Sequence, residues 1–244
     1  MQCPGQDSRY WKPGAIFESK CPECGGEIEF FKDEPSRRCK NCGHRVLNPK
    51  IDFGCATYCK YAEQCLGELS PELLAKRDDL LKDRVAIAMK RYFGQDFRRI
   101  NHARRVARYA EEIGKNEQAN MAVILCAAYL HDIGIKEAER KHQNTAARYH
   151  EQEGPPVARQ ILEQLGARPE LIDEVCDIVR HHHQPRPQEA TNFKALYDAD
   201  LIVNLEEQQE KAPLDRDRLA AKIDKAFLTD SGQALARRVL LKLL

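Results

Sequence analysis

Apolar residues recur along this chain with two different periods. From residue 70 onward they follow helical spacing, and Ser70-Pro71-Glu72 combines an N-cap residue, a proline at the first helical position and an acidic first turn. Ahead of this point, residues 27–33 alternate as a strand does. We therefore predict a mainly α protein, with helices over residues 71–93, 96–116, 117–130, 155–165, 169–182, 192–205, 215–228 and 232–244.

Cysteine usage divides the chain at the same place. Eight of the ten cysteines fall at or before Cys65, and a loop over residues 67–70 separates them from the helical patterns. A chain of 244 residues with 42% hydrophobic content suffices for one sizeable core and a small module. We predict a cysteine-rich module over residues 1–69 and a helical bundle over residues 70–244.

Charge and hydropathy indicate the expected location and partners of the protein. Basic and acidic residues number 39 and 38, so no global field attracts nucleic acid or an anionic membrane. The start of the chain lacks the blocks of a signal peptide, and no run of eighteen apolar residues occurs. We expect a soluble cytoplasmic protein without a membrane partner. The amphipathic residues 234–244 can pack on the bundle or on a second subunit, which leaves an oligomer open.

Two C-x2-C knuckles stand in the N-terminal module. Their four cysteines, Cys21, Cys24, Cys39 and Cys42, have zinc-ribbon spacing, and each knuckle is followed by a glycine. Four thiolates complete a tetrahedral site, so His44 is not needed. A module this small has little core without metal, and we predict a zinc ribbon. Its mixed charge gives no basic face for nucleic acid and suits a protein partner better.

Four further cysteines of the module have irregular spacing. Cys3 is remote, and Cys55, Cys59 and Cys65 follow the pattern C-x3-C-x5-C. This set could hold a 4Fe-4S cluster or a second zinc, with inert thiols as the alternative. Cys126 and Cys176 lie in apolar helical stretches and are expected in the core.

His131 and Asp132 end the apolar run of residues 122–134. A carboxylate in such surroundings is costly unless it is paired, hydrogen-bonded or coordinated to a cation. A metal ion satisfies both side chains, and the chain offers further ligands in His102, His150, the run of residues 181–183 and Asp200. Within that run His182 shares a helical face with Val175, Ile178 and Val179, which favours it as the inward histidine.

The local sequences around these residues resemble the HD superfamily of metal-dependent phosphohydrolases. The resemblance covers residues 70–244 and rests on RRINHARRVARYAEEI, AAYLHDIG, YHEQEGPPVARQIL, VCDIVRHHH and LYDADLIVNL. It implies an HD-type helical bundle in which His102, His131, Asp132 and Asp200 bind a first metal. His150 and His182 look like second-metal ligands of two-metal members such as cyclic-dinucleotide phosphodiesterases. Residues 184–187, QPRP, stand where those enzymes have Gly-Tyr-Pro, which argues against that substrate.

The resemblance implies hydrolysis of a nucleotide or other phosphate ester, as a phosphomonoesterase or phosphodiesterase, by metal-activated water. Mixed histidine and carboxylate ligands suit iron, manganese or a similar divalent metal. Lys136 follows the dyad as the lysine of HDIGK motifs does and is our candidate for a catalytic cation. Arg99, Arg105 and Arg180 are weaker candidates.

Two other functions agree with the same residues. Some HD-superfamily members are similar in ligands yet use a di-iron site as oxygenases. Alternatively, the chain is a non-catalytic metal or redox sensor that binds a protein partner through its cysteine-rich module. The sequence carries no pattern that identifies a substrate.

Overall fold

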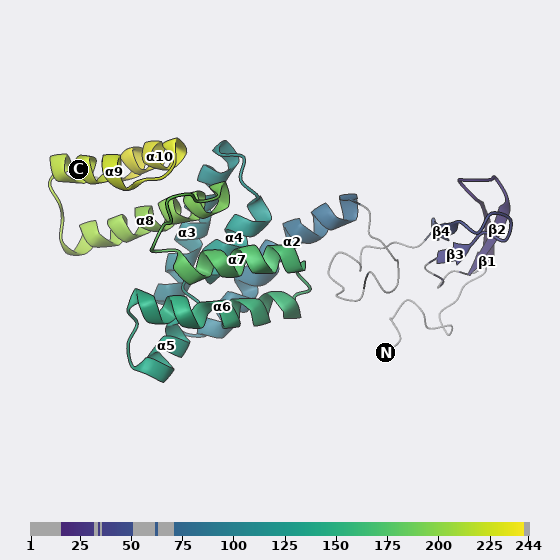
Figure 1. The fold of residues 1–244 in the computed structure, drawn as a ribbon, viewed down its shortest axis with the longest axis horizontal. Coiled ribbons are helices and arrows are strands. Elements are labelled where there is room, and N and C mark those ends of the chain that lie inside the picture. The colour runs from purple at the N-terminus through teal and green to yellow at the C-terminus, as the bar shows by residue number, and fades with distance from the viewer. Residues whose placement is uncertain (1–15, 32–33, 35, 51–61, 63–70, 242–244) are drawn as a thin grey trace. The chain divides into compact units, whose positions relative to one another are not determined.

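The computed structural model describes residues 16–31, 34, 36–50, 62 and 71–241 (Figure 1). By contacts between residues the chain divides into two units, Met1–Arg77 and Asp78–Leu244. The predicted cluster or second zinc on Cys3, Cys55, Cys59 and Cys65 lies outside the described residues and stays a prediction.

The N-terminal unit contains two short hairpins. Strand β1 (Ile16–Lys20) pairs antiparallel with β2 (Glu27–Phe31), and β3 (Ser36–Arg38) pairs antiparallel with β4 (Arg45–Leu47). The alternation over residues 27–33 thus gives a strand, as predicted, whose described part ends at Phe31. Ile28 and Phe30 point inward from β2 and pack with Val46 and two cysteines.

The second unit is entirely helical in its described part, which confirms the mainly α prediction (Figure 1). Its helices are α2 (Pro71–Phe93), α3 (Phe97–Asn116), α4 (Met121–Leu130), α5 (Ile135–His142), α6 (Ala147–Gln164), α7 (Pro169–His181), α8 (Thr191–Lys211), α9 (Arg216–Ala226) and α10 (Asp230–Leu240). None of the helices in the described part of the chain combines the length and the apolar character that a membrane span requires.

The helices differ from the sequence prediction in several places, among them the end of α8, which lies at Lys211 where residue 205 was expected. Helix α4 begins at Met121 because the Asn120 side chain accepts hydrogen bonds from the first free N–H groups. Helix α6 begins at Ala147, eight residues before the prolines that were expected to open it. Helix α5 was not predicted, because its mostly polar residues give no clear apolar period.

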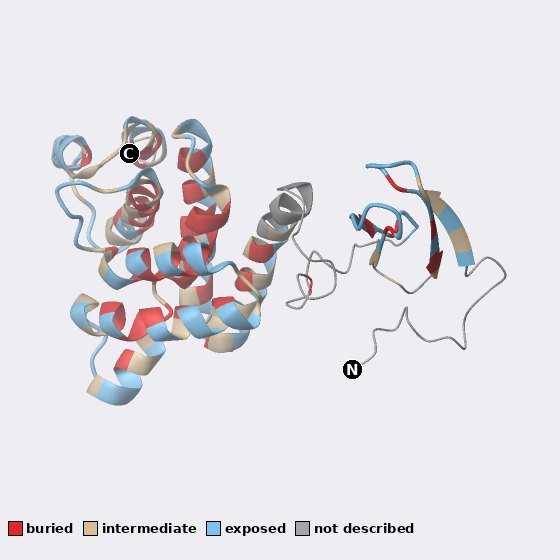
Figure 2. Ribbon diagram, turned by 45° about the vertical axis from the view of Figure 1, so that its right-hand side comes forward, coloured by how far each residue is buried: buried red, intermediate tan, exposed pale blue. Residues whose placement is uncertain are grey.

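Helix α4 is the centre of the bundle. Eight of its ten residues are buried, and it contacts α3, α7 and α8 (Figure 2). A helix that is apolar on every side is stable in water only when other helices surround it. The end of α4, where His131 and Asp132 follow, therefore lies deep in the helical unit.

The C-terminal helices are fixed by one buried carboxylate. Asp198 of α8 is 0% exposed and accepts hydrogen bonds from the N–H groups of Leu228 and Thr229 at 2.8 Å and from the Thr229 hydroxyl at 2.7 Å. Gly232 passes so close that a Cβ there would lie 2.2 Å from an Asp198 oxygen. These contacts hold the start of α10 against α8.

Replacing Asp198 should therefore destabilise the bundle. Asp198→Ala leaves two partly buried N–H groups without an acceptor, and we expect the free energy of unfolding to fall by about 2–4 kcal/mol. Urea denaturation followed by circular dichroism measures this. Exposed Asp217 is the matched control, and Asp217→Ala should change the value by less than about 0.5 kcal/mol. Equal effects of both variants would contradict the assignment.

Candidate metal centre

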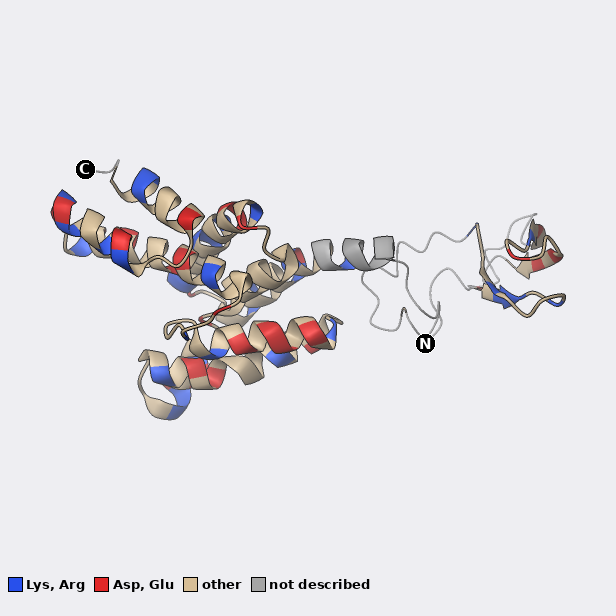
Figure 3. Cartoon of the chain, turned by 45° about the horizontal axis from the view of Figure 1, so that its top comes forward, with Lys and Arg blue, Asp and Glu red and all other residues tan. Residues whose placement is uncertain are grey.

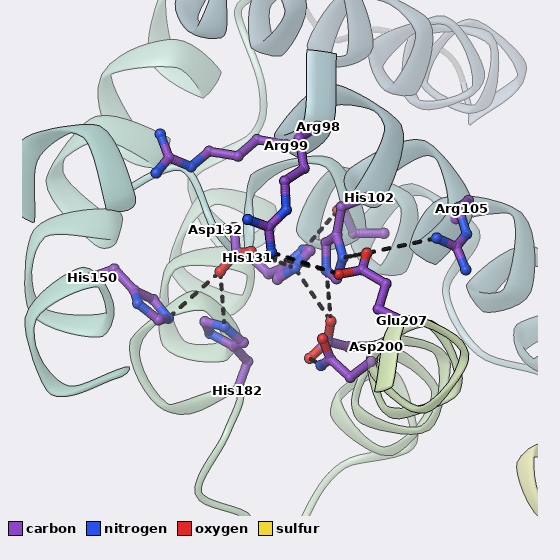
Figure 4. Close-up of polar contacts among 12 residues, drawn as sticks. Arg98, Arg99, His102, Arg105, His131, Asp132, His150, His182, Asp200 and Glu207 are labelled. Carbon is purple, nitrogen blue, oxygen red and sulfur yellow. Dashed lines mark hydrogen bonds and ion pairs between the residues drawn. The ribbon is translucent and has the colours of Figure 1, made fainter. Parts of the chain in front are cut away.

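The structure brings all six predicted ligands of the helical unit together (Figure 4). They come from five places in the chain: His102 from α3, His131 and Asp132 from the end of α4, His150 from α6, His182 from the end of α7 and Asp200 from α8. Their convergence depends on α4, whose end points between the other helices.

Asp132 lies between two groups of imidazole rings. Its Oδ2 faces the Nε2 atoms of His131 and His102, at 3.4 and 3.9 Å. Its Oδ1 faces the Nε2 atoms of His150 and His182, at 3.5 and 3.7 Å. Each carboxylate oxygen therefore has its own pair of nitrogen ligands, as a carboxylate that bridges two cations requires.

Two ligand groups result. Asp200 completes the first, with its Oδ1 3.0 Å from His102 Nε2 and 3.5 Å from His131 Nε2. The second group consists of Asp132, His150, His182 and His183. The candidate ligand atoms of His102, His131 and Asp200 lie within 4.8 Å of one another, and so do those of the second group, close enough in each case to share one cation.

Hydrogen bonds orient four of the rings. In each ring Nδ1 lies 2.9 or 3.0 Å from an oxygen acceptor, so Nδ1 carries the proton and a neutral ring presents the lone pair of Nε2. The pairs are His131 with Ala128 O, His182 with Val179 O, His150 with Thr145 O and His102 with Glu207 Oε1.

Two of the Nε2 atoms have no hydrogen-bond partner among the described residues. His131 Nε2 and His182 Nε2 are buried without a hydrogen bond, and each residue is 1% exposed. A buried polar atom left unsatisfied costs about 1–3 kcal/mol. Because both atoms face Asp132 oxygens, a cation between nitrogen and carboxylate satisfies all of them. The residues present thus fit a pair of metal ions.

The charges of the metal-free site are strongly coupled. Burial opposes protonation of His131, but Asp132 and Asp200 raise its pKa to about 9. Burial disfavours the charged form of both carboxylates, yet the neighbouring histidines hold the pKa of Asp132 well below its usual range and that of Asp200 at about 2. A proton on His131 therefore takes the place of a cation when metal is absent.

His183 is a further candidate ligand, from the run of histidines in which the sequence favoured His182. Its Nε2 lies 3.1 Å from His150 Nε2, and burial together with His182 lowers its pKa to about 4. Helix α7 ends at His181, so the helical period that favoured His182 does not predict where the side chain of His183 points. Buried Glu151 holds this turn, because it accepts hydrogen bonds from the His183 N–H and the Gln184 amide.

The remaining histidines of these segments have other partners. His181 bonds the Asp177 carbonyl and Glu189 and stacks on Phe193. His142, the nearby alternative to His150, bonds Glu153. The expectation that His182 points inward agrees with the structure.

A cavity of about 430 Å³ opens beside the first ligand group. His102 and Asp132 reach it directly, which explains why the Asp132 side chain remains 21% exposed. Arg98 and Arg99 also line it. Arg99 is held by Asp96 and Glu139 at 2.8 and 2.6 Å. The side chain of Arg98, in contrast, is 80% exposed, and its ion pair with Glu207 is long at 4.0 Å.

Lys136 does not line this cavity. Its ammonium donates to the Tyr92 carbonyl at 3.1 Å and lies over the Tyr92 ring, so the structure gives no support to a catalytic role. Arg105 bonds Glu206 at 2.7 Å, and Arg180 is exposed without lining the cavity. The lysine of the motif points along the outer side of the turn, which a motif cannot reveal.

Glu207 and Asn204 form hydrogen bonds to two of the candidate ligands. Glu207 bonds His102, and the Asn204 amide donates to Asp200 at 2.9 Å. Both residues follow Asp200 on one face of α8, at positions i+4 and i+7. That spacing is the sequence signal that would have identified them.

The four cysteines of the ribbon also converge. Cys21 Sγ lies 3.6 Å from Cys42 Sγ, and Cys24 Sγ lies 3.6 Å from Cys39 Sγ. A tetrahedral zinc with bonds of about 2.3 Å places its sulfurs about 3.8 Å apart. Gly25 and Gly43 adopt φ values of 69° and 75°, which close the two knuckles and which glycine tolerates best. The site fits the predicted zinc.

Replacing Glu151 should weaken the second ligand group selectively. Glu151→Ala leaves the His183 N–H without its acceptor and frees the turn that carries His182. We expect the affinity for a second Mn²⁺ to fall at least about tenfold, and for the first to change less than about twofold. Metal titration of the full chain measures both. Glu163→Ala, an exposed position of the same helix, is the control, and equal loss of both ions would contradict the role.

Metal affinity should rise with pH. Because the pKa of His131 is raised to about 9, its ring is protonated at neutral pH in the metal-free protein and must lose a proton to bind metal. We expect the apparent Mn²⁺ association constant to increase about tenfold per pH unit from pH 6.5 to 8.5 and to level off above pH 9. Calorimetry in buffers of different ionisation enthalpy counts the released protons, and a pH-independent affinity would refute this.

The helical unit of this chain is similar to known proteins. The HD domain family matches residues 99–226, which include every ligand of both groups. A crystal structure of a predicted HD superfamily hydrolase from an uncultured Thermotogales bacterium is 24% identical, with a TM-score of 0.46, over 68% of this chain and 86% of that one. No curated protein matches significantly. Since the family match spans more than half of the 244 residues, the chain belongs to the HD domain family.

Proposed function

We propose that this protein is a two-metal phosphohydrolase that acts on a small phosphate ester. One observation carries the proposal: the two oxygens of Asp132 face two separate sets of histidine nitrogens, beside a cavity with two arginines. A site of this kind can hold two cations at the short separation that phosphoryl transfer to water uses.

The ligand set favours a first-row transition metal. Its members are imidazole nitrogens and carboxylate oxygens, a mixture that suits iron or manganese better than magnesium. Such cations, when bound, polarise phosphoryl oxygens and lower the pKa of water. The histidines that hold them are already oriented through Nδ1, so little reorganisation accompanies metal binding.

The protein's own groups can orient the substrate. Arg99 is fixed by two carboxylates, so its guanidinium offers phosphate oxygens a donor in a defined place. Arg98 is free to move toward a bound anion because its contact with Glu207 is long. A cavity of about 430 Å³ suits a small molecule, such as a nucleotide, rather than a folded polymer.

For the ribbon we propose a structural role, in which its four cysteines bind zinc. Its buried cluster is small, so metal at the four thiolates would stabilise it. We infer a protein partner for this module rather than nucleic acid, on the mixed charge of its sequence.

Hydrolysis of p-nitrophenyl phosphate and bis-p-nitrophenyl phosphate, with iron or manganese supplied, tests the function. Asp132→Asn replaces one bridging oxygen by an amide nitrogen, and we expect it to lower kcat at least about a thousandfold. Asp173→Asn, at an exposed surface position, should leave kcat unchanged. The ratio of the two substrates separates phosphomonoesterase from phosphodiesterase activity.

Two results would overturn this function. Oxygen consumption without ester hydrolysis by the iron-loaded protein would show a di-iron oxygenase. Two bound metals without turnover of either ester or of oxygen would show a metal sensor.

A further inference from the structure

A second cavity of about 470 Å³ lies between α2, α3 and α4, away from the metal ligands. It is lined in part by Lys82, Arg104 and Tyr129. Arg104 follows His102 by two residues, so it projects about 200° around α3 from the metal centre. The two cavities therefore lie on different faces of the same helix.

Three hydrogen-bond donors in this cavity have no hydrogen-bond acceptor among the described residues. Neither Lys82 nor Arg104 forms an ion pair with a carboxylate of the described residues, and the hydroxyl of half-buried Tyr129 has no hydrogen bond within that part of the chain. Unpaired cations gathered in one concave site repel one another, and an anion removes this repulsion. A bound anion would accept hydrogen bonds from these donors.

Other charges in the cavity are partly compensated. Glu111 is bonded to Lys115 at 2.8 Å, Arg105 is bonded to Glu206, and Asp83 is the remaining acidic side chain of the lining. The lining has four cationic and two anionic residues. Elsewhere basic and acidic side chains are interspersed along the helices (Figure 3). The cavity is therefore a local excess of positive charge in a chain whose net charge is only +1.

We propose that this cavity binds the phosphate group of a small phosphorylated molecule. A guanidinium, an ammonium and a phenol O–H supply directed donors for the tetrahedral oxygens of phosphate. Two acids of the lining, Asp83 and Glu111, oppose the anion and limit its affinity. This site is independent of the proposed hydrolysis, because none of its lining residues belongs to the metal ligands.

Equilibrium dialysis of the metal-loaded full chain against ³²P-labelled inorganic phosphate tests the site. The double variant Lys82→Ala/Arg104→Ala should bind one phosphate fewer per chain than wild type, through a loss of affinity of at least about thirtyfold. Lys90→Ala/Arg91→Ala removes the same charge from α2 outside this cavity and should bind as wild type does. Phosphate bound at the metal centre is common to all of these proteins and cancels in the comparison.

Two single substitutions make the test specific. Asp83→Asn removes one opposing charge, and we expect phosphate to bind about threefold tighter. Tyr129→Phe keeps the ring and removes one donor, and we expect binding about fivefold weaker. If the double variant fails to fold, Tyr129→Phe alone still tests the site.

Equal phosphate binding by wild type, Lys82→Ala/Arg104→Ala and Tyr129→Phe would overturn the site. A ten-nucleotide RNA that displaces phosphate and binds more than a hundredfold tighter, with the same dependence on Arg104, would overturn the small-molecule assignment. Because no hydrolysis is measured, these outcomes do not depend on the enzymatic activity.

Discussion

The placement of one carboxylate, Asp132, organises the helical unit. Its two oxygens face nitrogens of histidines from α3, α6 and the ends of α4 and α7, so the positions of four helices must agree with one another. An ionised carboxylate at the end of an apolar helix is costly without compensation. Protonated His131 supplies part of that compensation in the metal-free protein, and two cations would supply more. Metal binding therefore adds to the stability of this unit by mass action.

Backbone contact makes this convergence possible. A Cβ at Gly134 would lie 2.2 Å from the His150 carbonyl oxygen and 2.4 Å from the Gly154 nitrogen. Helix α6 thus passes directly against the turn that follows the dyad, and it does so because Gly134 lacks a side chain. A Cβ at Gly154 would instead lie 2.7 Å from Val179 Cγ1. The approach carries His150 to Asp132 Oδ1, at 3.5 Å. The glycine after the dyad is consequently part of the second ligand group, although it contributes no ligand.

The sequence predicted those features that local patterns determine. Spacing identified the cysteine knuckles, and an uninterrupted apolar run identified α4 with the dyad at its end. Features that depend on tertiary contacts are not determined by such local patterns. His183 enters the site from a turn, where helical periodicity no longer gives direction, and Lys136 turns toward Tyr92 because the neighbouring helix offers it a carbonyl. The start of α6 was misplaced because proline usually opens a helix, whereas here packing continues it.

The two units depend on metal in opposite ways. The ribbon has a buried cluster of five residues, two of them cysteines, so its hydrophobic contribution is small and a metal bound to its thiolates would supply much of its folding energy. The helical unit buries an extended apolar core that includes nearly all of α4, and this core positions the ligands before any cation arrives. In the ribbon a bound metal would stabilise the fold, whereas in the bundle the fold itself holds the candidate ligands in place. The second arrangement leaves ligand positions exposed to a cavity, which is what chemistry on a substrate requires.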